Sequence, residues 1–165
     1  KVLVDYPTEQ EEFTVVHRMT GPAPTVSAVT DTASLQRIQA HCRLGYVDPA
    51  LMQYAVQLVA ATRFPERHGL ADLQRFLGMG ASPRATIGLV EGARALAYLR
   101  GRTYAMPQDL IDIVPDVLRH RLVLSYEALA EGMTSDQLIA RILQTIKPPT
   151  QALHHHVQVA QAPAA

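Results

Sequence analysis

Apolar residues recur every three or four positions along most of the chain, the spacing that places them on one face of an α-helix. The clearest run begins after Asp48-Pro49, where Asp48 is a typical N-cap and Pro49 suits the first helical position. Its apolar face consists of Leu51, Tyr54, Ala55, Leu58, Val59 and Thr62. This pattern predicts a helix that ends near Thr62 and contributes one face to a hydrophobic core.

The same periodicity, combined with local start and stop signals, predicts further helices. Thr8 and Thr134 each begin a sequence with capping-box spacing, and Gly101 suits the position after a helix end. Helices are expected over residues 8–19, 32–43, 83–100, from 107 onward with a kink or restart at Pro115, and 134–146, with a short helix within 70–77. The fold class predicted is all-α, a small helical bundle with at most short β elements near Leu44–Val47 or Arg102–Met106.

Composition and charge narrow the class of protein. The chain has 165 residues, of which 48% are hydrophobic and 18% charged, as expected of one folded domain. A formal net charge of zero argues against nucleic-acid binding, and no apolar run reaches the roughly 18 residues that a membrane span needs. Cys42 is the single cysteine, so a reducing cytoplasm is expected, and its apolar helical face predicts a packed core thiol.

The candidate chemistry lies at the start of the helix that follows Gly80-Ala81. Ser82 is a good N-cap and Pro83 suits the first helical position, which puts Arg84 in the first turn. Arg84 points away from the apolar stripe of Leu89, Val90, Ala93, Leu96 and Ala97. The residues on its own face include the small Gly88 and Ala95, so little bulk surrounds it. This placement fits either an arginine that receives an anion at a helix N-terminus or a solvated surface arginine.

The segment Gly80-Ala81-Ser82-Pro83-Arg84 resembles the sensor 2 motif in the C-terminal lid of AAA+ ATPases of the MoxR family. Other segments resemble the family in the same order, over about residues 1 to 125. These are Val4-Asp5-Tyr6-Pro7 with Glu11-Glu12, then Ala61-Thr62-Arg63, Gly101-Arg102, Pro107-Gln108-Asp109 and Leu118-Arg119-His120-Arg121. The resemblance implies an AAA+ lid fold in which Arg84 reaches the terminal phosphate of a bound nucleotide.

The resemblance also implies an organisation and a set of partners. Residues 1–20 would be the end of an ATPase core with its linking helix and residues 21–146 the lid, so a fragment of a larger protein is expected. Residues 147–165 are predicted to be a disordered tail from their composition, which is mostly Ala, Gln, Pro and His. The parent protein would hydrolyse ATP with Mg²⁺. Its partners would be its own ATPase core, neighbouring subunits of a ring and a von Willebrand A-domain protein. No phosphate loop is present in this sequence, so the chain alone is not expected to be an enzyme or to bind ATP tightly.

Two further candidate sites and one alternative function remain to be considered. Arg63 is either a second phosphate-facing cation or a structural ion-pair partner, and the structural role is favoured because most arginines near helix ends are exposed. His154-His155-His156 invites a metal site, but consecutive residues do not share a helical face and no acidic or cysteine partner lies nearby, so a flexible tail is predicted. The alternative function is a helical protein-interaction module that binds a partner helix in an apolar groove and has no nucleotide role.

Overall fold

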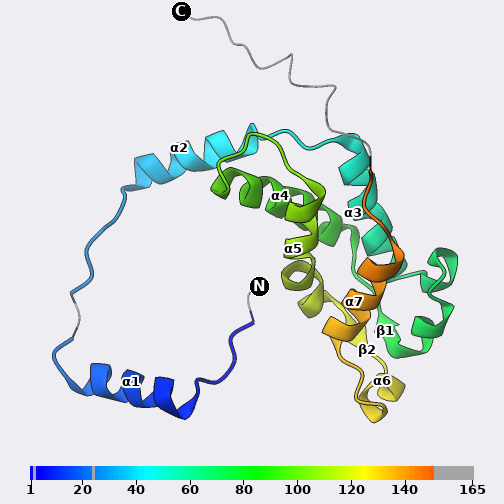
Figure 1. The fold of residues 1–165 in the computed structure, drawn as a ribbon, viewed down its shortest axis with the longest axis horizontal. Coiled ribbons are helices and arrows are strands. Elements are labelled where there is room, and N and C mark those ends of the chain that lie inside the picture. Colours follow the sequence, from blue (N-terminus) through cyan, green and yellow to red (C-terminus); the bar gives the residue numbers. More distant parts are fainter. Residues whose placement is uncertain (2, 24, 151–165) are drawn as a thin grey trace, which may run out of the picture. The chain divides into compact units, whose positions relative to one another are not determined.

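The structure is a computed structural model that describes residues 1, 3–23 and 25–150, and the tail that contains His154-His155-His156 lies outside these residues. The chain divides into two compact units, Lys1–His41 and Cys42–Ala165. The described residues are mostly helical, with one small two-stranded sheet, which confirms the predicted fold class (Figure 1). None of the helices found among them is long and apolar enough to cross a membrane.

Helix α2 (Thr32–Arg43) has the predicted limits, and α1 (Glu9–Thr20) begins and ends one residue later than predicted. The capping box of α1 is formed: the Thr8 N–H donates to a Glu11 carboxylate oxygen at 2.8 Å, and the Glu11 N–H donates to the Thr8 hydroxyl at 3.4 Å. Neither helix has a buried residue. The prediction for Cys42 was therefore too strong, because its side chain is only half-buried at the end of α2.

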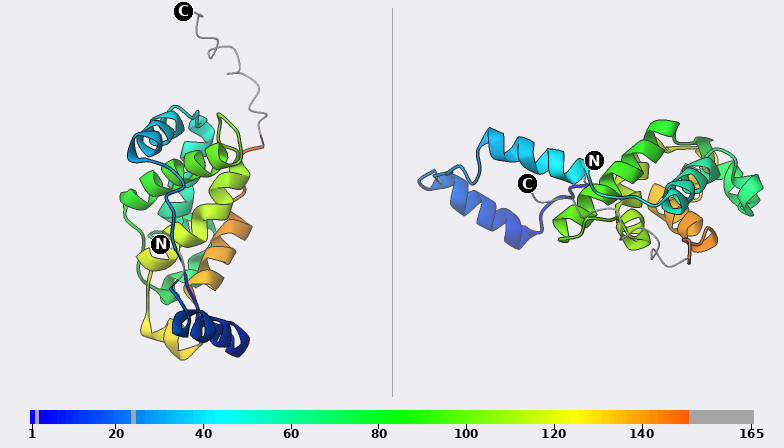
Figure 2. Two further views of the ribbon diagram at one scale, coloured as in Figure 1. Left: turned by 90° about the vertical axis from the view of Figure 1, so that its left-hand side faces the viewer. Right: turned by 90° about the horizontal axis from the view of Figure 1, so that it is seen from above.

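The second unit is built on four helices that contact one another in a closed ring. These are α3 (Pro49–Ala61), α4 (Pro83–Leu99), α5 (Pro107–Leu118) and α7 (Ser135–Thr145). Helix α4 lies against both α3 and α5, and α7 lies against α5 and α3 (Figures 1 and 2). The short α6 (Tyr126–Ala130) joins β2 to α7.

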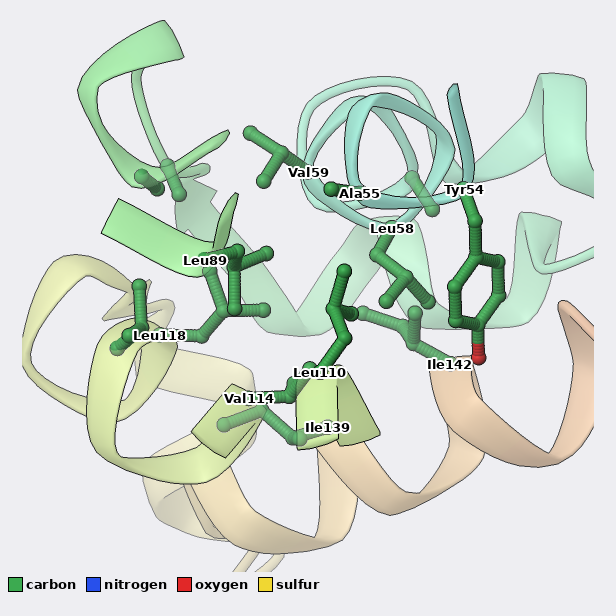
Figure 3. Close-up of a cluster of buried hydrophobic side chains, with 14 of the residues drawn as sticks. Tyr54, Ala55, Leu58, Val59, Leu89, Leu110, Val114, Leu118, Ile139 and Ile142 are labelled. Atoms are coloured by element: carbon green, nitrogen blue, oxygen red, sulfur yellow. The ribbon is translucent and has the colours of Figure 1, made fainter. Parts of the chain in front are cut away.

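The centre of this ring is filled by side chains that all four helices contribute (Figure 3). The face predicted for α3 is buried along its whole length, from Leu51 at 1% exposure to Thr62 at 1%. Side chains labelled in Figure 3 come from α3 (Tyr54, Ala55, Leu58, Val59), α4 (Leu89), α5 (Leu110, Val114, Leu118) and α7 (Ile139, Ile142). The periodicity of the sequence therefore identified the core faces correctly.

Two short β features accompany the helices. A backbone bridge joins Tyr46 to Tyr104, with the Tyr46 N–H donating to the Thr103 carbonyl at 2.8 Å. This bridge confirms the expectation of short β elements in those two segments. The antiparallel pair β1 (Leu77–Met79) and β2 (Val123–Leu124) was missed, because strands of two or three residues carry too little alternation to be recognised.

The structure differs from the expected helices in two places, within residues 65–76 and around Pro115. The segment expected as a short helix within 70–77 is a 3₁₀-helix, η2 (Ala71–Phe76), which follows another, η1 (Pro65–His68). Helix α5 runs through Pro115 without a restart, and the 3₁₀-helix η3 (Arg119–Arg121) continues from its end. The helix continues because proline removes a single N–H donor, and the apolar face of α5 stays buried on both sides of it.

Candidate functional site

The candidate site begins at the end of α3, where a buried hydroxyl joins two distant segments. Thr62 is the C-cap of α3, and its side chain is almost wholly buried. Its hydroxyl donates to the Val59 carbonyl at 2.7 Å and accepts from the Ala81 N–H at 2.9 Å. The hydroxyl therefore acts both as a hydrogen-bond donor and as a hydrogen-bond acceptor. The Ala61-Thr62-Arg63 segment is thereby connected directly to the loop that leads into α4.

The same loop touches α3 at Gly80, at a distance that only glycine allows. A Cβ atom at residue 80 would lie 2.2 Å from the Thr62 carbonyl oxygen, 2.6 Å from the Thr62 carbonyl carbon and 2.8 Å from Arg63 Cγ. Real Cβ atoms do not approach other heavy atoms so closely, so the side chain of any other residue would push the loop away from α3. The glycine of the motif is thus required by the packing of the loop, and Arg63 lies beside it.

Helix α4 begins as predicted, with Pro83 as its first residue and Arg84 in its first turn. The predicted capping bond of Ser82 is wrong: Ser82 has an extended N-cap conformation, but its hydroxyl accepts no bond from the helix. The backbone fulfils part of that role, since the Ala85 N–H donates to the Ser82 carbonyl at 2.8 Å. Ser82 and Arg84 are both exposed, so the first turn of α4 is accessible to solvent.

Two glycines on α4 near Arg84 differ in how closely their neighbours approach. Gly88 and Gly92 lie on the side of α4 that faces α5, where a Cβ at residue 92 would meet Ile113 Cδ1 at 2.5 Å. At residue 88 a Cβ would meet Val117 Cγ1 at 3.6 Å. Gly92 therefore lets Ile113 of α5 pack directly against α4, whereas at Gly88 a Cβ would make only ordinary contact, so close packing does not require a glycine there.

Arg63, just after the end of α3, and Arg84, in the first turn of α4, are both exposed. Of the ion pairs formed within residues 1, 3–23 and 25–150, none includes either guanidinium. The structural ion pair that was favoured for Arg63 is therefore not found there. Within the same residues no group of three or more histidine, cysteine or acidic side chains is arranged to hold a metal ion. An arginine fork beside a helix N-terminus is chemically suited to a phosphate group.

A second polar cluster closes the opposite end of α4. Asp109 is fully buried and accepts from Arg100 and Arg102, each at 2.7 Å, and from the Met106 N–H at 2.7 Å. Burial by itself raises the pKa of Asp109. The hydrogen bonds from Arg102, Met106 and Arg100 together lower it by more than burial raises it, so the pKa lies below its ordinary value. This cluster joins the Gly101-Arg102 and Pro107-Gln108-Asp109 segments, and every charge in it is paired within the bundle.

The contacts of Thr62 and Gly80 were not anticipated from the sequence. The sequence placed Thr62 on the buried face of its helix, and it placed Thr62 and Gly80 in two separate segments that resemble the family, without a contact between them. A polar residue at the end of an otherwise apolar face was the one signal available, because a buried hydroxyl requires a partner. The sequence could not identify that partner, since the Ala81 N–H is 19 residues away.

Comparison with known proteins places this architecture in a class. Residues 70–142 match a family model described as the AAA lid domain. The match contains the Gly80–Arg84 loop, all of α4 and α5, and most of α7, whereas α3 with Thr62 and Arg63 lies before it.

Individual relatives are more specific. The chain is 44% identical over 149 residues to "Chaperone MoxR1" of Mycobacterium tuberculosis, and this alignment covers 90% of the chain and 40% of that protein. It is 38% identical over 110 residues to "Protein MoxR" of Paracoccus denitrificans, covering 63% of the chain and 32% of that protein. A solved structure described as a "putative ATPase" from Cytophaga hutchinsonii has a TM-score of 0.81 and 31% identity, covering 88% of this chain and 45% of that one.

The chain thus spans less than half the length of the relatives it matches. Taken together, the family match, the two MoxR proteins and the similar ATPase structure support a lid domain of a MoxR-type AAA+ ATPase.

Proposed function

We propose that this chain is the nucleotide-sensing C-terminal lid of a MoxR-type AAA+ ATPase, and that Arg84 is the residue that senses the nucleotide. The lid would couple ATP binding and hydrolysis to its own movement in a chaperone-like remodelling complex. The observation that carries this proposal is the exposed Arg84 in the first turn of α4, in a domain similar to MoxR proteins. The family match favours this function over a helical interaction module.

The local geometry supports a phosphate as the ligand of Arg84. The helix dipole places partial positive charge at the N-terminus of α4, and the adjacent guanidinium adds a full charge with several N–H donors. Arg63 is a second contact in this proposal, because its side chain lies against Gly80 at the same loop. Ser82 would contribute its hydroxyl, which caps no backbone group of α4.

The rest of the machinery belongs to the parent protein in this proposal. ATP and Mg²⁺ would be held by the ATPase core, and when bound they would supply the phosphoryl group and the metal charge that such a reaction requires. The lid would contribute the Arg84 guanidinium, which would bind the phosphate of a nucleotide held by the core. Neighbouring subunits of a ring and a von Willebrand A-domain protein are the proposed partners, and the cytoplasm is the proposed location.

The experiment is Arg84→Ala in the full-length ATPase. A positioned arginine that meets charge on a transferred phosphate typically contributes about 10²–10⁵ in turnover, so a loss of at least about tenfold is expected. In the isolated chain the same change should alter the free energy of unfolding by less than about 0.5 kcal/mol, since the side chain is exposed.

The matched control is Arg141→Ala on α7, which removes an exposed arginine that pairs with Asp72 at 2.8 Å. This variant should keep its turnover because no part of the proposal involves that ion pair. Unchanged turnover in Arg84→Ala, or an equal loss in both variants, would exclude a sensing role for Arg84.

A further inference from the structure

Thr62 is the one buried polar side chain in the described part of the bundle whose partners include the candidate site. Asp109 is the other buried polar side chain there, and its partners all lie at the far end of α4 and the start of α5. Thr62 instead bonds to the backbone of Ala81, one residue before Ser82. A buried hydroxyl that links two segments is costly to leave unpaired, so this contact constrains both of them.

The contact controls where α4 begins relative to α3. Between Thr62 and Ala81 the chain passes through η1, η2 and β1, and it returns to α3 at the Gly80-Ala81 peptide. Ala81 is 1% exposed, so its N–H can find no solvent partner if the hydroxyl is removed. Arg84 follows three residues later, in the first turn of the helix that begins at Pro83. A shift of the loop would therefore be transmitted to the guanidinium.

We propose that Thr62 is a positioning residue for Arg84: its hydroxyl holds the Gly80-Ala81 loop on α3 and thereby aims the first turn of α4. The proposal rests on the proposed sensing function of Arg84, which it deepens by naming the group that orients the sensor. Thr62 itself does not touch the nucleotide. It acts through the Ala81 N–H, in the way that supporting hydrogen bonds orient functional groups elsewhere.

Two substitutions separate the hydroxyl from the shape of the side chain. Thr62→Val keeps nearly the same volume but removes the donor and the acceptor, whereas Thr62→Ser keeps both and loses a methyl group. Both variants are made in the full-length ATPase, alone and combined with Arg84→Ala. Turnover is measured with saturating and limiting ATP, and amide hydrogen exchange is followed by mass spectrometry in a peptide that contains Ala81.

The expected result has three parts. Thr62→Val raises exchange in that peptide by about tenfold, because the buried N–H loses its acceptor. It lowers kcat and kcat/KM together by about three- to thirtyfold, as a small misplacement of a functional group does. In the Arg84→Ala background the same change lowers turnover by less than about twofold, because the side chain that Thr62 orients is already gone. Thr62→Ser stays close to the parent in every measurement.

Different failures point to different errors. Unchanged exchange in Thr62→Val overturns the inference and leaves the sensing role of Arg84 intact. Losses that simply multiply in the double variant also overturn it, because they mean that Thr62 acts independently of Arg84. Unchanged turnover in Arg84→Ala alone overturns the proposed function, while increased exchange in Thr62→Val would still support the loop contact.

Discussion

The sharpest structural prediction concerns Gly80→Ala, which adds one methyl group where the loop touches α3. The added Cβ would lie 2.2 Å from the Thr62 carbonyl oxygen, whereas ordinary van der Waals contact begins at about 3.4 Å. The loop must then move by about 1 Å or the end of α3 must yield. Neither movement is easy, because the contacting atoms are backbone and Thr62 is buried.

The magnitude follows from two losses. Forcing an extra methyl group into a packed interior costs about 1–3 kcal/mol. A displaced loop also lengthens the bond from the Ala81 N–H to the Thr62 hydroxyl, which is 2.9 Å long in the structure and contributes about 1 kcal/mol. We therefore expect Gly80→Ala to lower the free energy of unfolding of the chain by about 2–4 kcal/mol, measured by urea denaturation monitored by circular dichroism.

Gly78→Ala is the matched control, since Gly78 lies in β1, two residues before Gly80. A Cβ there would meet the Leu124 and Val123 carbonyl oxygens at 3.4 Å, which is ordinary contact. Its backbone, like that of Gly80, lies outside the left-handed region, so alanine introduces no conformational strain at either position. Gly78→Ala should change stability by less than about 1 kcal/mol. If both variants have equal stability, the close approach of the loop to α3 is not a constraint on the fold.

Three other predictions follow. Leu58→Ala should destabilise the chain by about 2–5 kcal/mol in the same assay, since Leu58 is fully buried, and a loss below about 0.5 kcal/mol would mean that it is not in the core. The pKa of Asp109 is lowered in the folded state, so its ionised carboxylate stabilises the fold above about pH 4, and this contribution is lost as the pH falls further. Between about pH 6 and pH 3, Asp109→Asn should therefore lose less free energy of unfolding than the parent chain, and equal losses would contradict this. The chain alone should neither hydrolyse ATP nor bind it tightly, because a few charge-assisted bonds cannot replace a phosphate loop, and turnover that co-elutes with the protein in size exclusion would refute the lid assignment.

The sequence by itself determined the helices, most of their limits and the residues of the core. Capping residues such as Thr8 and Asp48 act on backbone groups two or three positions away, so their effect can be read locally. The buried face of α3 follows from the helical repeat alone. The position of Arg84, exposed in the first turn of α4, is determined in the same way, by Pro83 and by the angle between Arg84 and the apolar stripe.

Only the tertiary structure decided which segments meet. The bond between Thr62 and Ala81, the pairing of β1 with β2, and the burial of Asp109 under two arginines each join residues whose separation in the chain carries no periodic signal. These contacts form because packing of the bundle buries backbone and charged groups away from water, and buried polar groups are stable only when they are hydrogen-bonded. Two of the segments that resemble the family, Ala61-Thr62-Arg63 and the Gly80–Arg84 loop, are in this way connected directly in front of the first turn of α4.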